Sequence, residues 1–180
     1  MKTAAVDQGV DTEKADRQFL GTAGTYYVMA ELAFQNIHAS CTFGNAPYVD
    51  ILASAPDGSR TLAIQVKTAF NAVRRRGRGE ERKPDHLEWP IGRKIAQIAS
   101  PSLFLALVDA KKCKGAPDIY VVPSTFIRDH FEGRLEELKW VRLHIGLKEM
   151  DRFKNNWTLV REALGYEPVG SPDTTEQQDD

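Results

Sequence analysis

The fold is decided by two apolar stretches, Pro47-Tyr48-Val49-Asp50-Ile51-Leu52 and Leu62-Ala63-Ile64-Gln65-Val66-Lys67-Thr68. Turn-forming residues 56–59 lie between them, which predicts a β-hairpin of about 47–55 and 61–69. Because side chains alternate along a strand, Gln65 and Lys67 share one face, and the hairpin can bring Asp50 to them. Burying unpaired charge is unfavourable, so a carboxylate, an amide and an ammonium group in such apolar strands indicate a polar site.

The rest of the chain alternates between helical and extended patterns. A helix with apolar residues at spacings of three and four precedes the hairpin, and a short strand at 39–43 lies between this helix and the hairpin. Beyond the hairpin the patterns predict a polar loop at 70–88, helices at 91–99, 124–133 (capped by Ser124) and 147–164, and strands at 102–108, 119–122 and 140–145. This order, αβββαβ and then βαβα, predicts an α/β fold whose mixed sheet has helices on both sides.

The hairpin resembles the PD-(D/E)xK nuclease superfamily, which places an acid on one strand and an acid-x-Lys triplet on the next. Here the pattern reads Asp50, a spacer, and Gln65-Val66-Lys67, with glutamine where the second acid usually stands. The resemblance covers about residues 17–125 and implies a restriction-endonuclease-like αβββαβ core. It also implies a metal-dependent endonuclease that hydrolyses DNA, works with Mg²⁺ or Mn²⁺, and forms a homodimer.

The resemblance assigns a role to each candidate residue. Asp50, Gln65 through its amide oxygen and Val66 through its backbone carbonyl are expected to bind the metal. Lys67 is expected to position the attacking water. Glu31 is the candidate for an auxiliary acid from the first helix, although in similar nucleases the acid directly follows a glycine, and here Thr25 follows Gly24.

A basic segment follows the hairpin and is the candidate contact for nucleic-acid phosphates. Because glycines separate its cations, we expect a flexible loop that could clamp the phosphate backbone of DNA, and RNA is an alternative ligand. Its basic residues are Arg74, Arg75, Arg76, Arg78, Arg82 and Lys83. An alternative function is that of a catalytically inactive nuclease-fold protein that binds nucleic acid or assembles with a partner, in a defence or repair system. Gln65 and Thr25 favour this alternative.

Composition sets wider limits. The formal net charge is −1, but residues 167–180 hold five acids and no base, so the remainder has 24 basic and 20 acidic side chains, a net of +4. We expect one domain at 15–165, a flexible arm at 1–14 and a disordered acidic tail at 166–180. Two cysteines and no apolar run of membrane-spanning length indicate a cytoplasmic protein without a membrane partner. The four histidines, at 38, 86, 130 and 144, are scattered without ligand spacing, which argues against a histidine metal site.

Overall fold

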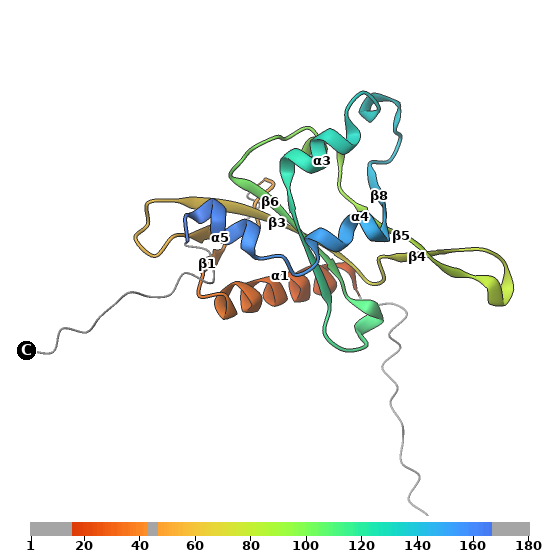
Figure 1. The fold of residues 1–180 in the computed structure, drawn as a ribbon, viewed down its shortest axis with the longest axis horizontal. Helices are drawn as coiled ribbons and strands as arrows, with labels where there is room; N and C mark the ends of the chain where they lie inside the picture. Colours follow the sequence, from red (N-terminus) through yellow and green to blue (C-terminus); the bar gives the residue numbers. More distant parts are fainter. Residues whose placement is uncertain (1–15, 43–46, 167–180) are drawn as a thin grey trace, which may run out of the picture.

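A five-stranded mixed sheet forms the centre of the computed structural model, which describes residues 16–42 and 47–166 (Figure 1). Its strand order is β1-β2-β3-β6-β7. The strands are β1 (His38–Cys41), β2 (Ile51–Ser54), β3 (Thr61–Ala69), β6 (Leu103–Asp109) and β7 (Asp118–Pro123). Strands β3 and β6 are parallel, and all other neighbours in this sheet are antiparallel. The expected α/β fold with a mixed sheet flanked by helices is confirmed.

Each face of this sheet is covered by a separate apolar cluster. On one face α1 (Arg17–Phe34) and α5 (Thr158–Leu164) pack against the even-numbered residues of β3, Ile64 and Val66. On the other face lie α2 (Arg93–Ala96), α3 (Ser124–Phe131) and α4 (Leu147–Met150), packed over Leu105 and Leu107 of β6. The buried runs of β6 and β7 are apolar on both faces for this reason.

Helix α1 approaches β3 closely at one point. Gly24 is buried, and a Cβ atom built on it would lie 1.9 Å from Oγ1 of Thr68. Only glycine therefore fits at this crossing of helix and strand. None of the described helices is long and apolar enough to cross a membrane.

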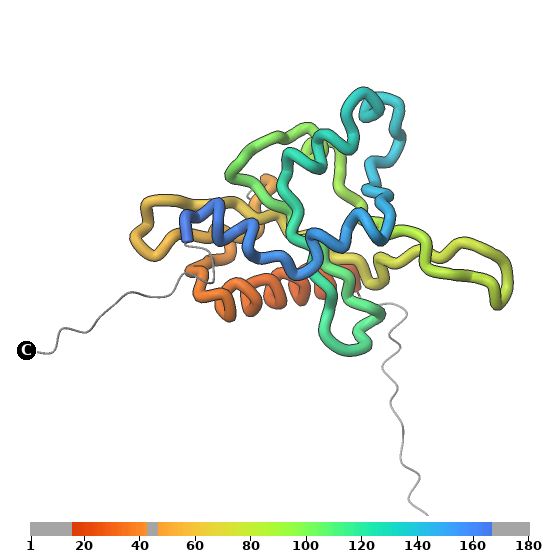
Figure 2. Tube along the Cα trace, in the orientation of Figure 1, coloured from red at the N-terminus to blue at the C-terminus, as the bar shows by residue number. Residues whose placement is uncertain are grey.

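A second, three-stranded sheet with the order β4-β5-β8 stands beside the first. Its strands are β4 (Val73–Arg76), β5 (Lys83–Pro90) and β8 (Arg142–Gly146). The inner face, with Leu87, Trp89 and Leu143, packs on the core, and the Trp89 indole N–H donates to the carbonyl oxygen of Val108 at 3.0 Å. The β4–β5 ribbon extends away from the rest of the molecule (Figure 2). Single 3-10 turns occupy Gly79–Glu81, Lys111–Cys113, Leu135–Glu137 and Asp151–Phe153.

The second sheet corrects two expectations. Residues 70–88, expected to be a loop, contain β4 and most of β5, paired as an antiparallel ribbon with an irregularity between Arg74 and Arg75. The strand expected at 140–145 exists as β8, but it pairs with β5 and does not extend the central sheet. Strand pairing over such a polar segment is possible because the backbone makes the hydrogen bonds between the strands, and the polar side chains need no apolar core.

Two helix expectations are also wrong. The helix expected at 147–164 is interrupted, because Asn155 has a left-handed φ of 49° and its backbone N–H donates to the Ile119 carbonyl at 2.7 Å. Ser124 does not cap α3 through its side chain; the hydroxyl instead donates to the carbonyl oxygen of Ser100 and accepts from its N–H. The expected arm at 1–14 and tail at 166–180 lie outside the described residues, except for Tyr166.

Candidate active site

Asp50, Gln65 and Lys67 come together at the start of β2 and the middle of β3. The backbone N–H of Asp50 donates to the Ile64 carbonyl at 3.0 Å, which fixes this residue beside β3 just before β2 begins. The Asp50 carboxylate then accepts the backbone N–H of Val66 at 2.6 Å and an N–H of the Gln65 amide, both through Oδ2. Gln65 is buried, and its amide gives the Asp50 carboxylate a second hydrogen-bond donor beside the Val66 N–H.

An open cavity of about 450 Å³ connects these residues with the segment that enters α2. Its lining consists of Tyr48, Asp50, Gln65, Lys67, Ile91, Gly92, Arg93, Lys94 and Ile95. The three residues expected from the hairpin therefore share one cavity. Arg93 and Lys94 are additional cations that the sequence did not point to, because nothing in their spacing relates them to β3.

The cavity is dominated by positive charge. Among the described residues that line it, Asp50 is the one carboxylate, and Lys67, Arg93 and Lys94 carry cations. Arg93 is held in place, since its guanidinium donates to the carbonyl oxygens of Leu135 at 2.5 Å and Leu138 at 2.6 Å and lies 3.4 Å from the exposed Glu136 carboxylate. Lys94 is exposed. This balance of charge favours an anionic ligand such as a phosphate.

The same residues fit a hard divalent cation. The Gln65 amide nitrogen lies between Oδ2 of Asp50 and the Val66 carbonyl oxygen, which is 3.5 Å away. Turning the amide over would present its oxygen at this place, beside a carboxylate and a carbonyl oxygen, and Mg²⁺ prefers such ligands together with water. Because the site supplies a single carboxylate, oxygens of a substrate phosphate would add ligands and negative charge, and the cation would bind more tightly when substrate is present.

Glu31 does not reach this cavity. It is half-buried on α1, and α1 packs against the face of the central sheet that carries Ile64, Val66 and Thr68. Gln65 and Lys67 project from the opposite face, because they alternate with those residues along β3. The sheet thus separates Glu31 from the other three candidates.

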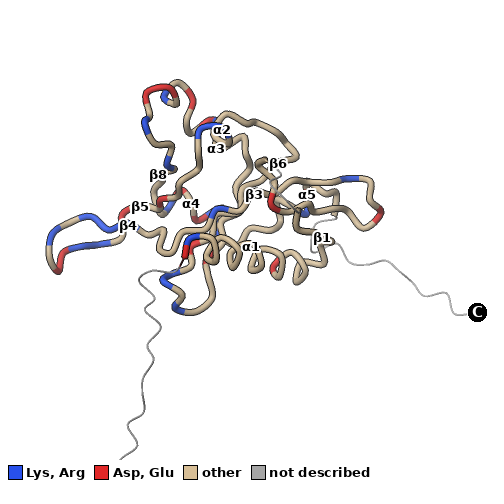
Figure 3. The backbone as a smooth tube through the Cα atoms, turned by 180° about the vertical axis from the view of Figure 1, so that it is seen from behind, with Lys and Arg blue, Asp and Glu red and all other residues tan. Residues whose placement is uncertain are grey.

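The six expected phosphate contacts are all on the β4–β5 ribbon, but they are not equivalent. Arg74 binds Glu88 Oε1 at 3.1 Å and the Asn71 carbonyl oxygen at 2.6 Å. The Arg75 guanidinium donates to the carbonyl oxygen of Arg82. The remaining cations are exposed; they are Arg76, Arg78, Arg82 and Lys83. Figure 3 shows basic positions along the ribbon and acidic positions at its tip.

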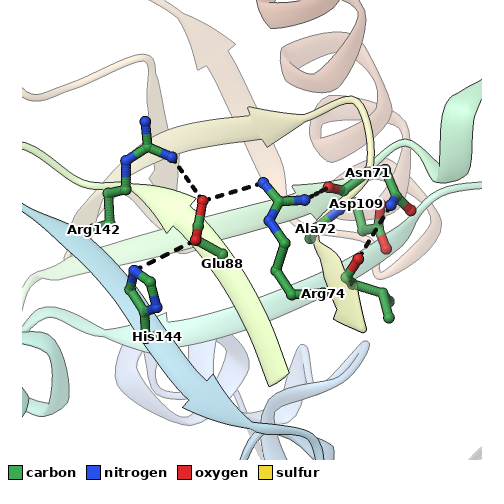
Figure 4. Close-up of polar contacts among 8 residues, drawn as sticks. Asn71, Ala72, Arg74, Glu88, Asp109, Arg142 and His144 are labelled. Carbon is green, nitrogen blue, oxygen red and sulfur yellow. Dashed lines mark hydrogen bonds and ion pairs between the residues drawn. The ribbon is translucent and has the colours of Figure 1, made fainter. Parts of the chain in front are cut away.

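The outer face of the second sheet holds a polar cluster around Glu88 (Figure 4). Oε1 of Glu88 accepts from Arg142 at 2.7 Å and from Arg74, and Oε2 lies 3.4 Å from Nε2 of His144. Partial burial raises the pKa of the Glu88 carboxyl, but the hydrogen bonds from Arg142 and Arg74 outweigh it, so the pKa lies below its ordinary value. The expectation that the histidines are scattered is wrong here, because pairing of β5 with β8 stacks the rings of His86 and His144, with centroids 5.3 Å apart.

Comparison with known proteins supports the fold and not a family. No protein-family model matches the chain, and no curated protein matches its sequence. The fold is similar to that of a bacterial homing endonuclease of solved structure, with a TM-score of 0.52 over 82% of this chain and 93% of the other, at 10% identity. The fold is therefore nuclease-like.

Proposed function

We propose that this protein is a divalent-metal-dependent phosphodiesterase that hydrolyses DNA, a PD-(D/E)xK-type endonuclease with Gln65 in place of the second acid. One observation carries the proposal. Asp50, Gln65 and Lys67 line the same cavity, with the Asp50 carboxylate bound to both Gln65 and the Val66 backbone.

Each residue has a role that its position supports. Asp50, with the Gln65 amide oxygen and the Val66 carbonyl oxygen, would hold the cation. A bound divalent cation polarises the phosphoryl group and lowers the pKa of its water. The Lys67 ammonium would orient the attacking water and stabilise negative charge that develops on the phosphoryl oxygens, while Arg93 and Lys94 would attract the flanking phosphates.

DNA is the proposed substrate because two positive surfaces accompany the cavity. One is formed by Arg93 and Lys94 in the cavity itself, and the other is the exposed edge of the β4–β5 ribbon. Phosphate contacts of this kind position a duplex without reading its sequence. The similar bacterial protein is described as a homing endonuclease, which agrees with a DNA substrate. A homodimer would place one such cavity at each of the two strands of a DNA duplex.

A second candidate function is supported by the same geometry. Among the described lining residues Asp50 is the one acid, and its Oδ2 already accepts two N–H groups. A nuclease fold that had lost its chemistry would keep such a satisfied carboxylate for structure alone. The protein would then bind nucleic acid or a partner protein without cutting.

Cleavage assays separate the two functions. Wild type would be incubated with linear, supercoiled and branched DNA, each with Mg²⁺, Mn²⁺ or a chelator, beside Asp50→Asn. Asparagine keeps an oxygen that accepts the Val66 N–H but loses the charge, so we expect the cleavage rate to fall by roughly 10²-fold or more. Asp57→Asn, in the exposed turn before β3, is the matched control. Metal-dependent cutting that Asp50→Asn retains would overturn the proposal, and no cutting by wild type would favour the inactive scaffold.

A further inference from the structure

Three potential metal ligands meet on the outer face of the second sheet, away from the proposed active site. Glu88 of β5 is directly opposite His144 of β8, and His86 lies two residues before Glu88 on the same face. One ligand atom from each of His86, Glu88 and His144 lies within 4.8 Å of the others. Because the rings of His86 and His144 are stacked, they would have to turn for a nitrogen of each to point at one ion beside Glu88.

The partners of His86 orient its ring for such a role. Nδ1 of His86 lies 2.8 Å from Oδ2 of Asp85, so a proton on Nδ1 is donated to that carboxylate. Nε2 of the same ring then keeps its lone pair. A carboxylate on the far nitrogen is the usual companion of a metal-binding histidine, since it fixes the tautomer and increases the basicity of the ligand.

The partners of Glu88 leave one oxygen for a ligand. Both guanidinium groups, of Arg74 and Arg142, bind Oε1, whereas Oε2 faces the His144 ring. The arginines therefore hold the carboxylate in one orientation without occupying Oε2 (Figure 4). Their positive charge opposes a cation, which makes the site weaker than a structural site with four protein ligands.

We propose that His86, Glu88 and His144 bind a first-row transition-metal dication such as Zn²⁺, with water as the remaining ligand. Two imidazoles and one carboxylate are a donor set that suits Zn²⁺ and not Mg²⁺. The ion would join β5 to β8 at the base of the basic β4–β5 ribbon. This site is separate from the Asp50 cavity, whose oxygen ligands suit a hard cation, and it stands whether or not the chain cuts DNA.

A simpler account treats this cluster as a solvated polar face. Glu88 would then serve as the counter-ion of Arg74 and Arg142, and the histidines would add little. The two accounts differ in a measurable way, because only a metal site makes both histidines necessary for tight binding of Zn²⁺.

The test is a Zn²⁺ titration of the full chain against a chromophoric chelator, in a Cys41→Ser/Cys113→Ser background that removes the thiols. We expect one Zn²⁺ per chain, and a loss of affinity of about tenfold or more in both His86→Ala and His144→Ala. His38→Ala, an exposed histidine on β1, is the matched control and should bind as the parent does. The expected rise of the melting temperature with Zn²⁺ should also be absent from the two site variants.

Two results would overturn the proposal. One is a parent chain that binds no Zn²⁺ while it is folded, as judged by circular dichroism. The other is unchanged Zn²⁺ affinity in both His86→Ala and His144→Ala. If His144→Ala fails to fold, His144→Gln retains a polar side chain and is measured in its place.

Discussion

The carboxylate of Asp50 accepts the backbone N–H of Val66 at 2.6 Å, so the acid at the edge of β2 is joined to the strand that carries Gln65 and Lys67. This contact keeps the candidate site together before any ligand binds. It also means that Asp50 has a structural role beside its proposed role in catalysis. The two roles can be separated by the choice of substitution.

Asp50→Ala should destabilise the fold more than Asp50→Asn. Alanine leaves the N–H of the buried residue Val66 and the amide of Gln65 without their acceptor, which costs about 1–3 kcal/mol of the free energy of unfolding, whereas asparagine retains an oxygen. Urea unfolding of the two variants and the wild type measures the difference. Equal stability of the two variants would show that Asp50 does not support β3.

Gly24→Ala should destabilise the protein, while Gly21→Ala should not. The new Cβ at position 24 would lie 1.9 Å from Thr68 Oγ1, so α1 must move away from β3, at a cost of about 1–3 kcal/mol. A Cβ on Gly21 meets nothing within 4 Å, and alanine is the better helix former, so this control should gain up to about 1 kcal/mol.

The close contact with Thr68 can be checked in the same thermal or urea experiments. Thr68→Ala combined with Gly24→Ala removes Oγ1 and should restore part of the lost stability. Failure of the double variant to recover any stability would contradict the close approach of α1 to β3.

Glu88→Gln should lower stability near neutral pH and make little difference in acid. The pKa of Glu88 is depressed in the folded protein. The contribution of this carboxylate to the free energy of unfolding is therefore fully present above the ordinary pKa, and it is lost as the pH falls through the pKa of the folded state. We expect the difference in unfolding free energy between wild type and Glu88→Gln to shrink from pH 7 to about pH 3. Glu162→Gln, an exposed residue of α5, is the control and should show no such trend.

Gln65→Glu tests whether the site binds a cation. It would place a second carboxylate against Asp50, so without metal we expect a lower melting temperature than that of wild type. Mg²⁺ or Mn²⁺ should raise the melting temperature of this variant more than that of wild type, and cleavage should persist or change its metal preference. A variant whose melting temperature does not respond to either ion would favour the inactive scaffold.

The hairpin could be predicted because no breaker interrupts its second strand, but its first strand begins at Ile51 and not near residue 47, since Tyr48 has a left-handed φ of 70°. Alternation within the second strand alone is enough to place Gln65 and Lys67 on one face and Ile64 and Val66 on the other. Contacts between distant segments could not be predicted in this way. Arg93 and Lys94 line the cavity because the segment after β5 packs near β3, and His144 reaches Glu88 because β5 pairs with β8.

Other differences have local causes that composition conceals. The arginines and glycines of 70–83 suggest a loop, yet backbone pairing of β4 with β5 requires no apolar side chain at the tip. The apolar pattern of 147–164 continues through Asn155, although this residue leaves the helical conformation to bond β7 through its backbone N–H and side-chain oxygen. Glu31 is suggested by its place on the first helix and by the resemblance, and neither indicates which face of the sheet α1 covers.

The most direct test of the proposed function is the rate of Mg²⁺- and Mn²⁺-dependent cleavage of DNA by wild type beside Lys67→Ala. Lys148→Ala, an exposed lysine of α4, controls for the loss of one positive charge. We predict metal-dependent cutting by wild type and by the control. In Lys67→Ala the cleavage rate should fall by roughly 10²–10³-fold, because no ammonium group stabilises the developing charge. Cutting by Lys67→Ala at the wild-type rate, or a folded wild type that cuts none of the DNA substrates, would contradict the account.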